Sequence, residues 1–172
     1  MFLNHLKNFF TKKIVKKSLS NVKLTGANDK IETVGIIFDE TYFHEREALV
    51  EELISNGIQS GKIRILLFKN TIKQSDRFEY PVFSNKDLSW AATFSKSDVK
   101  DFIAQKFDLL INYYDTEKSA LLIVSNLSKA NFKVGFSSID KKLNHFMIDT
   151  HAENYKVFVD ELFKYLKILN KI

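Results

Sequence analysis

The chain has 172 residues, of which 45% are hydrophobic, and it carries 26 basic and 21 acidic side chains for a net charge of +5. It has no cysteine, which excludes disulfide scaffolds, cysteine-ligated zinc, iron–sulfur clusters and thiol catalysis. Six lysines and no acidic residue lie in residues 1–28, so the other 144 residues hold 20 basic and 21 acidic side chains and net −1. We therefore predict a basic helical arm with a linker at 1–28 and one α/β domain at 29–172, a length typical of a single domain.

Residues 2–19 are predicted to form an amphipathic helix, followed by a polar linker at 20–32 that contains Gly26. Apolar side chains recur in the helix at spacings of three and four residues, which places them on one stripe. The members of this N-terminal apolar stripe are Phe2, Leu3, Leu6, Phe9, Phe10 and Ile14. The lysines fall beside the stripe, except that Lys13 and Lys17 intrude on it.

The distribution of apolar residues also predicts the compartment. Lysines interrupt the first residues before an apolar core of about 7–15 residues, as in a secretory signal, can form. No apolar run approaches the roughly 18 residues of a membrane span. We expect a cytoplasmic protein.

From residue 33 onward, short apolar runs alternate with helical patterns. The predicted strands are 33–39, 62–68, 107–114, 132–137 and 145–149, and the predicted helices are 46–56, 98–106, 117–130 and 153–169. Gly57 fits the position after a helix, Ser97 fits an N-cap and Asn131 fits a left-handed cap. The alternation predicts an α/β three-layer sandwich around a mostly parallel, Rossmann-like sheet, with the basic N-terminal helix added in front.

Residues 69–96 show the least regular pattern, and Pro81 within them favours a short edge strand or an extended loop. Trp90 lies in the same region as Phe78, Tyr80 and Phe83. This cluster either forms an exposed aromatic platform for bases or a peptide, or packs the irregular segment onto the sheet. We favour the packing interpretation.

Polar residues follow several predicted strands, and ligands of open parallel sheets bind at the carboxyl ends of the strands. The residues expected at this strand-end rim are Asp39, Glu40, Asn112, Asp115, Ser138, Asp149 and His151. A ligand site is one interpretation of the rim. The other is capping, because acidic and hydroxyl side chains bind free N–H groups at helix starts and suit the helix dipole.

Sequence motifs give no support for a cofactor, a metal ion or a catalytic nucleophile. No G-x-G-x-x-G or P-loop occurs, and the loop after the first strand is acidic, which disfavours a pyrophosphate there. None of the histidines shows H-E-x-x-H spacing, and the short pairs at 44–45 and 149–151 offer two ligands where zinc needs at least three. The serines at 137 and 138 do not form a G-x-S-x-G elbow. We expect no cofactor and no metal, and these patterns favour a role other than catalysis.

The lysines of the arm are Lys7, Lys12, Lys13, Lys16, Lys17 and Lys23. They allow three interpretations. An RNA-binding arm would use them for phosphate contacts, and a membrane-surface helix would place them on anionic lipid. A docking helix would pack the apolar stripe on its own domain or on a protein partner and leave the lysines in solvent. The arm has no arginine, the residue that makes bidentate contacts, which lowers the expectation of base-specific RNA recognition.

Residues 107–136 resemble a segment in the N-terminal half of the heptosyltransferase-type GT-B glycosyltransferases. The resemblance rests on Lys118-Ser119-Ala120-Leu121, at the start of a helix, and on Lys133-Val134-Gly135-Phe136, in the strand that follows. It implies a Rossmann-like fold. Those enzymes bind the nucleotide-sugar mainly through a second domain that this chain is too short to contain, and their N-terminal acceptor loop is missing here, so the resemblance implies no catalytic residue.

Over most of its length the chain also resembles a family of small α/β proteins from Bacteroidota that lack an assigned activity. That resemblance implies the architecture and no reaction. We expect a non-catalytic interaction protein that contacts RNA or a ribonucleoprotein through its basic arm. The alternatives are a small glycosyltransferase-like domain that binds a sugar or nucleotide-like ligand at the strand-end rim, and a peripheral membrane protein that binds an anionic surface.

Overall fold

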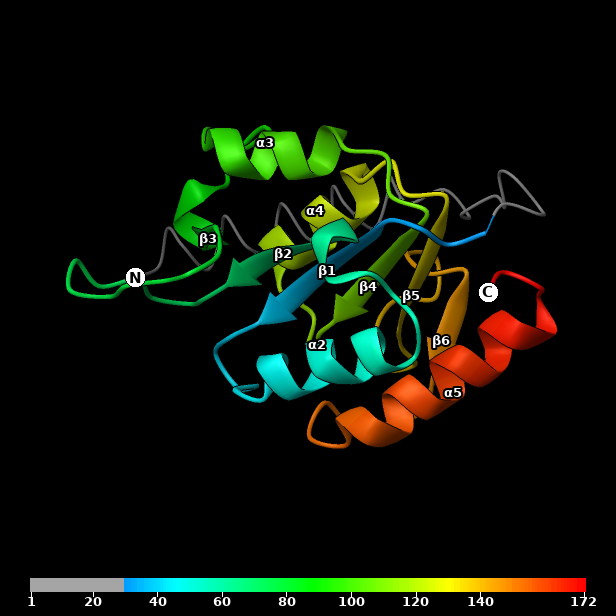
Figure 1. The fold of residues 1–172 in the computed structure, drawn as a ribbon. Helices are drawn as coiled ribbons and strands as arrows, with labels where there is room; N and C mark the ends of the chain where they lie inside the picture. Colours follow the sequence, from blue (N-terminus) through cyan, green and yellow to red (C-terminus); the bar gives the residue numbers. More distant parts are fainter. Residues whose placement is uncertain (1–29) are drawn as a thin grey trace.

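The computed structural model describes residues 30–172, so the predicted helix at 2–19 and most of its linker lie outside the described residues. Six strands form one sheet in the order β3-β2-β1-β4-β5-β6, and every neighbouring pair is parallel (Figure 1). The strands are β1 (Val34–Asp39), β2 (Ile63–Phe68), β3 (Val82–Phe83), β4 (Leu109–Tyr113), β5 (Phe132–Phe136) and β6 (Phe146–Ile148). The predicted α/β fold is confirmed, and within the described residues the sheet is parallel throughout.

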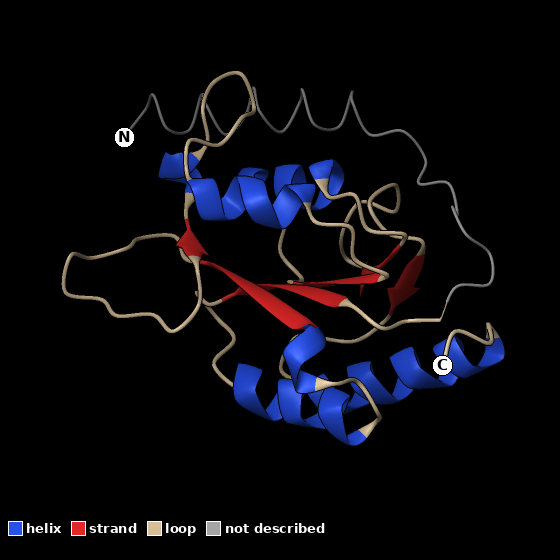
Figure 2. Cartoon of the chain, turned by 45° about the horizontal axis from the view of Figure 1, so that its top comes forward, coloured by secondary structure: helices blue, strands red, loops and turns tan. Residues whose placement is uncertain are grey.

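Helices cover both faces of the sheet and make the three layers that the sequence predicts (Figure 2). One face carries α3 (Ser97–Ala104) and α4 (Ser119–Leu127), and the other carries α2 (Arg46–Ser55) and α5 (Tyr155–Ile168). Short 3-10 turns, η1 (Ser60–Lys62) and η2 (Asn85–Asp87), lead into β2 and follow β3. The strand order reverses between β1 and β4, which places the switch point of the sheet at its centre.

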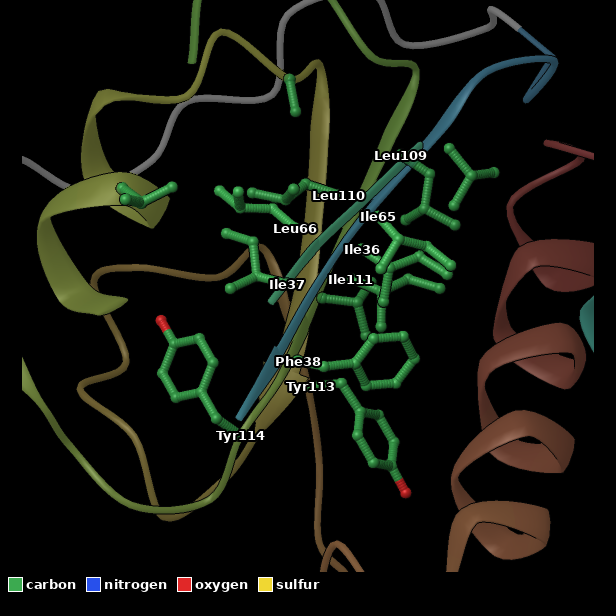
Figure 3. Packing of buried hydrophobic residues seen from close by; sticks show 14 of the residues in the cluster. Ile36, Ile37, Phe38, Ile65, Leu66, Leu109, Leu110, Ile111, Tyr113 and Tyr114 are labelled. Carbon is green, nitrogen blue, oxygen red and sulfur yellow. The ribbon is translucent and has the colours of Figure 1, made fainter. Parts of the chain in front are cut away.

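The central strands are apolar on both faces because helices cover both sides of the sheet. All six residues of β1 and all five of β4 are buried. Successive side chains of a strand point to opposite faces, and Figure 3 shows this alternation. Ile36, Phe38, Ile111 and Tyr113 point toward the α5 side, whereas Ile37, Leu66 and Leu110 point toward the α4 side. Continuous apolar runs, rather than alternating ones, are the pattern expected of such strands.

Two glycines of the sheet are required by close packing. A Cβ on Gly35 of β1 would lie 2.7 Å from the Phe107 ring, and a Cβ on Gly135 of β5 would lie 2.6 Å from Asn144 Nδ2. Gly57 has a different role, because its φ of +102° closes the C-terminal end of α2, as the sequence predicts.

Several local predictions need correction. Lys96 occupies the N-cap of α3 and Ser97 is its first residue, so Ser97 is not the cap. Helix α4 is shorter than the predicted 117–130 because Ser128, at ψ 137°, already leaves the helical conformation. Asn131 does not adopt a left-handed conformation; its N–H donates to Phe107 O (2.9 Å).

The segment 69–96 contains the short edge strand expected near Pro81, since β3 pairs with the last two residues of β2. Phe83 is fully buried and contacts the rings of Phe68 (5.3 Å between centroids) and Phe94 (5.8 Å). Trp90 is 55% exposed. The packing interpretation therefore holds for Phe83, while Trp90 lies at the surface. Among the described helices, none combines the length and the apolar character needed to cross a bilayer.

Candidate functional site

A buried ion pair spans the switch point of the sheet. Asp39 is the last residue of β1, and Lys118 immediately precedes α4 on the far side of the neighbouring strand β4. Lys118 Nζ donates to Asp39 Oδ2, and the two side chains are only 10% and 6% exposed. The ammonium also lies 4.6 Å from the ring centroid of Tyr42 and 4.9 Å from that of Phe68. The charge of Asp39 is thus neutralised inside the protein.

The second carboxylate oxygen and the carbonyl oxygen of Asp39 accept hydrogen bonds from the backbone after β1. Asp39 Oδ1 accepts the N–H of Thr41 (3.1 Å), and the Asp39 carbonyl accepts the N–H of Phe43 (3.2 Å). These contacts fold the loop between β1 and α2 into a tight turn, a common role for aspartate at a strand end. Both carboxylate oxygens therefore have intramolecular partners.

Glu40 belongs to a second charged cluster, directed toward the β2 side of the rim. Arg46, the first residue of α2, pairs with Glu40 through Nη1 and with Glu47 through Nη2 (2.8 Å). Its guanidinium also lies 5.8 Å from the ring centroid of Tyr80. Burial lowers the pKa of Arg46, but the hydrogen bond and negative charge of Glu40 outweigh that effect and raise it. Arg46 therefore stays cationic and holds Glu40 in place.

A cavity of about 250 Å³ opens between the loops after β1 and β4, which flank the switch point, and the segment between β6 and α5. It is lined by Tyr42, Phe43, Asp115, Thr116, Ala152 and Glu153. Asp115 is fixed at its edge, since Oδ2 accepts the N–H of Ala152 (3.2 Å) and its carbonyl accepts the Ser138 hydroxyl (2.8 Å). The cavity therefore presents an aromatic side chain, a threonine and two carboxylates to solvent.

Tyr113 is buried next to this cavity. Its hydroxyl donates to Ala152 O (2.6 Å), which ties the end of β4 to the segment before α5. Burial, and then the negative charge of Asp115, raise the pKa of Tyr113 above the ordinary tyrosine value. The hydroxyl therefore remains a neutral donor at all physiological pH values.

The remaining predicted rim residues have separate positions. Asp149 is exposed and accepts the Ser137 hydroxyl (2.7 Å), and His151 is exposed next to the cavity-lining Ala152. Neither Asp149 nor His151 lines the cavity. Asn112 is fully buried beneath α4, where its side chain bonds to Asn144 Oδ1 (2.7 Å) and Ser125 Oγ (2.7 Å).

Asn112 is part of a buried polar network that also contains a lysine. Tyr114 pairs its hydroxyl with Ser125 Oγ (2.6 Å), and Lys133 of β5 donates through Nζ to Ser125 O (2.7 Å). Lys133 is only 5% exposed, and burial lowers its pKa to about 8. The network joins β4, β5 and α4, and its members have partners within the protein, except that Asn144 Nδ2 has none among the described residues.

The structure brings Asp115 and Ser138 together, as the strand-end argument predicts, but it separates Asp39, Glu40 and Asn112 into different environments. Sequence reasoning missed Lys118 as the partner of Asp39. The signal is weak, because the partnership depends on β1 lying beside β4, and a single sequence does not reveal strand order. Lys133 was also missed; a cation within an otherwise apolar strand is an ambiguous signal, because Arg64 of β2 follows the same pattern and is exposed whereas Lys133 of β5 is buried.

Within residues 30–172, no three histidine, aspartate or glutamate side chains gather in a way that could hold a metal ion. The chain belongs to the Family of unknown function (DUF6913), whose model matches residues 7–169. A search of curated proteins finds no match to the chain. The resemblance to GT-B glycosyltransferases therefore stays a prediction.

Proposed function

We propose that this protein is a non-catalytic binding protein that contacts RNA, or an RNA surface of a ribonucleoprotein, through the lysines of residues 1–28. The observation that carries the proposal is the partition of charge. Residues 1–28 hold +6, whereas residues 29–172 hold −1 with 20 basic and 21 acidic side chains. A polyanion such as RNA attracts this segment and is not attracted by the net charge of the rest of the chain.

The state of the rim supports the non-catalytic part of the proposal. General acid–base or nucleophilic catalysis needs a carboxylate or base free to reach a substrate. The charge of Asp39 is taken up by Lys118, and that of Glu40 by Arg46. Asp115 holds Ala152 N and Asp149 holds the Ser137 hydroxyl. These contacts are the capping and loop-fixing roles that such residues commonly serve at strand ends.

The type of cation defines the kind of RNA contact. Lysine acts as a compact point charge, whereas arginine provides the planar fork that reads bases and pairs with phosphates bidentately. Because all six cations of the arm are lysines, we expect contacts to backbone phosphates with little dependence on sequence.

Removal of the six arm charges is expected to abolish RNA binding. Substitution of Lys7, Lys12, Lys13, Lys16, Lys17 and Lys23 by glutamine removes every cation of residues 1–28. In filter binding at low salt, the Kd for single-stranded RNA should rise by about two orders of magnitude or more.

The matched control removes the same number of charges from the described domain. Six exposed lysines of this kind are Lys100, Lys106, Lys129, Lys141, Lys142 and Lys156. Their substitution by glutamine should leave the Kd within a few-fold of the parent. Equal losses in the two variants, or no RNA binding by the parent at low salt, would overturn the proposal.

A second candidate function rests on the cavity at the switch point. Tyr42, which is 67% exposed, and Asp115 both line it, a combination of aromatic ring and carboxylate that suits a hydroxyl-rich ligand such as a sugar. Because Asp115 and Glu153 are both acidic, a neutral sugar fits better than a phosphate-bearing nucleotide.

Thermal shift with a panel of sugars and nucleotides tests this second function. A sugar that binds should raise Tm in a concentration-dependent way, and Asp115→Ala should remove the shift. Glu51→Ala, an exposed carboxylate on α2, should retain it. A shift that survives Asp115→Ala, or no shift with any sugar, would remove the cavity from consideration.

A further inference from the structure

The outer edge of the sheet beside β2 is only partly filled by β3. β3 pairs with Leu67 and Phe68, and no described strand pairs with the first part of β2 on that side. In the same register, residue 81 would donate its backbone N–H to Ile65 O, but this residue is Pro81, which has no N–H. The proline therefore ends the ladder and leaves an open strand edge.

Two hydrogen bonds show which backbone groups face the open edge. Phe68 O accepts the N–H of Glu40 (2.8 Å), next to β1, and Leu67 donates its N–H to Pro81 O (2.9 Å), next to β3. Successive residues of a strand direct their backbone groups to opposite neighbours, so Ile65 faces the same side as Leu67. The N–H and the C=O of Ile65 therefore point toward the open edge.

The open edge holds one unpaired donor and one unpaired acceptor. Ile63 also faces it, but its N–H donates to Ser60 O in η1 and its carbonyl accepts Arg64 Nη1 (3.1 Å). Within residues 30–172, neither backbone group of Ile65 is hydrogen-bonded. Such an edge is a template for a further strand.

A cavity of about 390 Å³ lies along this edge. It contacts three consecutive residues, Ile63, Arg64 and Ile65, although the side chains of successive residues point to opposite faces of a sheet. The cavity therefore borders the backbone at the edge of β2 rather than one face of the sheet. Tyr80 and Pro81, which lead into β3, also line it.

Helix α3 gives the cavity a negative charge. Asp98 and Asp101 line it, both are exposed, and neither takes part in an ion pair within the described chain. The guanidinium of Arg64, the basic residue of the lining, already binds Gly61 O (3.3 Å) and Ile63 O. The two carboxylates are therefore available to a cation from outside the chain.

We propose that this cavity binds an extended, basic peptide segment of a partner protein, which adds to the sheet beside β2 in line with β3. The peptide backbone donates an N–H to Ile65 O and accepts the Ile65 N–H, and its basic side chains approach Asp98 and Asp101. Two copies of this chain do not fit edge to edge, because each β2 edge lies within a cavity that only a slender segment enters. The proposal is independent of RNA binding, since none of these residues lies in 1–28.

The sheet also determines which side chains of the peptide should be basic. Leu66 points toward the α4 side (Figure 3), so Arg64, two residues earlier, shares that face, and α3 covers the same face (Figure 1). Every second side chain of an added strand points to this face and meets the two carboxylates of α3. The other side chains lie beside Ile63 and Ile65, so the expected pattern alternates apolar and basic residues.

Titration calorimetry at low salt, with the full chain and the capped peptide Val-Lys-Val-Lys-Val, tests the proposal. One peptide should bind per chain, and replacing its lysines by glutamate should raise the Kd about ten-fold or more. N-methylation of either the valines or the lysines tests the backbone contacts, because alternate N–H groups of a strand face opposite sides. One of the two methylated peptides should lose binding, and the other should keep it.

Substitutions in the chain test the charge complementarity. Asp98→Asn with Asp101→Asn should raise the Kd of the lysine peptide about ten-fold. The matched control, Glu51→Gln with Asp160→Asn, changes exposed carboxylates of α2 and α5 on the opposite face of the sheet. It should leave the Kd within about two-fold of the parent.

Amide hydrogen exchange locates the bound peptide. The N–H of Ile65 should exchange fast in the chain alone and about ten-fold or more slowly with saturating peptide. The N–H of Leu67, which is bonded to Pro81 O, should exchange slowly in both states.

Four results would overturn the proposal: no binding of the lysine peptide, the same effect of both N-methylation patterns, an unchanged Kd in the variant without Asp98 and Asp101, or slow exchange of the Ile65 N–H without peptide. If the slowly exchanging chain also sedimented as a dimer, the open edge would belong to a second copy.

Discussion

Lys118→Met is expected to lower the free energy of unfolding by about 3 kcal/mol, because it leaves the Asp39 carboxylate buried without its counter-charge. Asp39 and Lys118 side chains are 6% and 10% exposed, so water cannot replace the lost ammonium. Methionine keeps an apolar stem of similar length against the rings of Tyr42 and Phe68. The loss therefore reports on charge rather than on packing, and urea denaturation measures it.

Two variants serve as controls for Lys118→Met. Lys142→Met changes an exposed lysine and should alter stability by less than about 0.5 kcal/mol. Adding Asp39→Asn to Lys118→Met should recover part of the loss, because the amide oxygen still accepts the Thr41 N–H without carrying a charge. A Lys118→Met protein as stable as the Lys142→Met control would contradict a buried ion pair at the switch point.

The stability of the parent protein is expected to rise between about pH 8 and pH 10 because of Lys133. The pKa of Lys133 is lowered by burial from 10.5 to about 8. In this pH window the native protein has released the proton that the unfolded chain still binds, so increasing pH favours the native state. The gain is about 2–3 kcal/mol by pH 10.

Above pH 10 the trend should reverse. Burial is the largest cause that raises the pKa of Tyr113 and of Tyr114, so both native hydroxyls keep protons that the unfolded chain loses. The free energy of unfolding should therefore pass through a maximum near pH 10, which is measured by urea denaturation across a pH series.

Lys133→Met tests whether Lys133 causes the increase in stability between pH 8 and pH 10. This variant should show no increase in stability from pH 8 to pH 10, while Lys129→Met, at an exposed position, should keep it. At pH 10, where the parent has released the Lys133 proton, the variant should be about 1 kcal/mol less stable than the parent, since Ser125 O no longer receives its hydrogen bond. If the stability of Lys133→Met still increased from pH 8 to pH 10, the increase would be due to another group.

The fold was largely predictable because buried strands and helices need apolar side chains, and these leave a pattern in the sequence. A strand covered by helices on both sides is predominantly apolar, and residues 33–39 and 107–114 show this pattern. Helix ends were less predictable. Asn131 is a plausible left-handed cap in isolation, but its N–H is used by Phe107 O, a contact between distant segments.

The site was only partly predictable for the same reason. The sequence shows that polar residues follow the predicted strands. The strand-end argument built on this pattern placed Asp115 and Ser138 at the same edge of the sheet, where the structure has them in contact. Which strands are neighbours cannot be read from the sequence. The partner of Asp39 is a lysine 79 positions away, and the two meet only because β1 lies next to β4.

The salt dependence of RNA affinity tests the central claim, that six lysines of residues 1–28 bind phosphates, most directly. For single-stranded RNA each phosphate contact contributes about −0.7 to the slope of log K against log salt, so six contacts predict a slope near −4 for the parent protein. The slope should fall to near zero when the six arm lysines are changed to glutamine. A parent slope near zero, or an unchanged slope in that variant, would contradict the account.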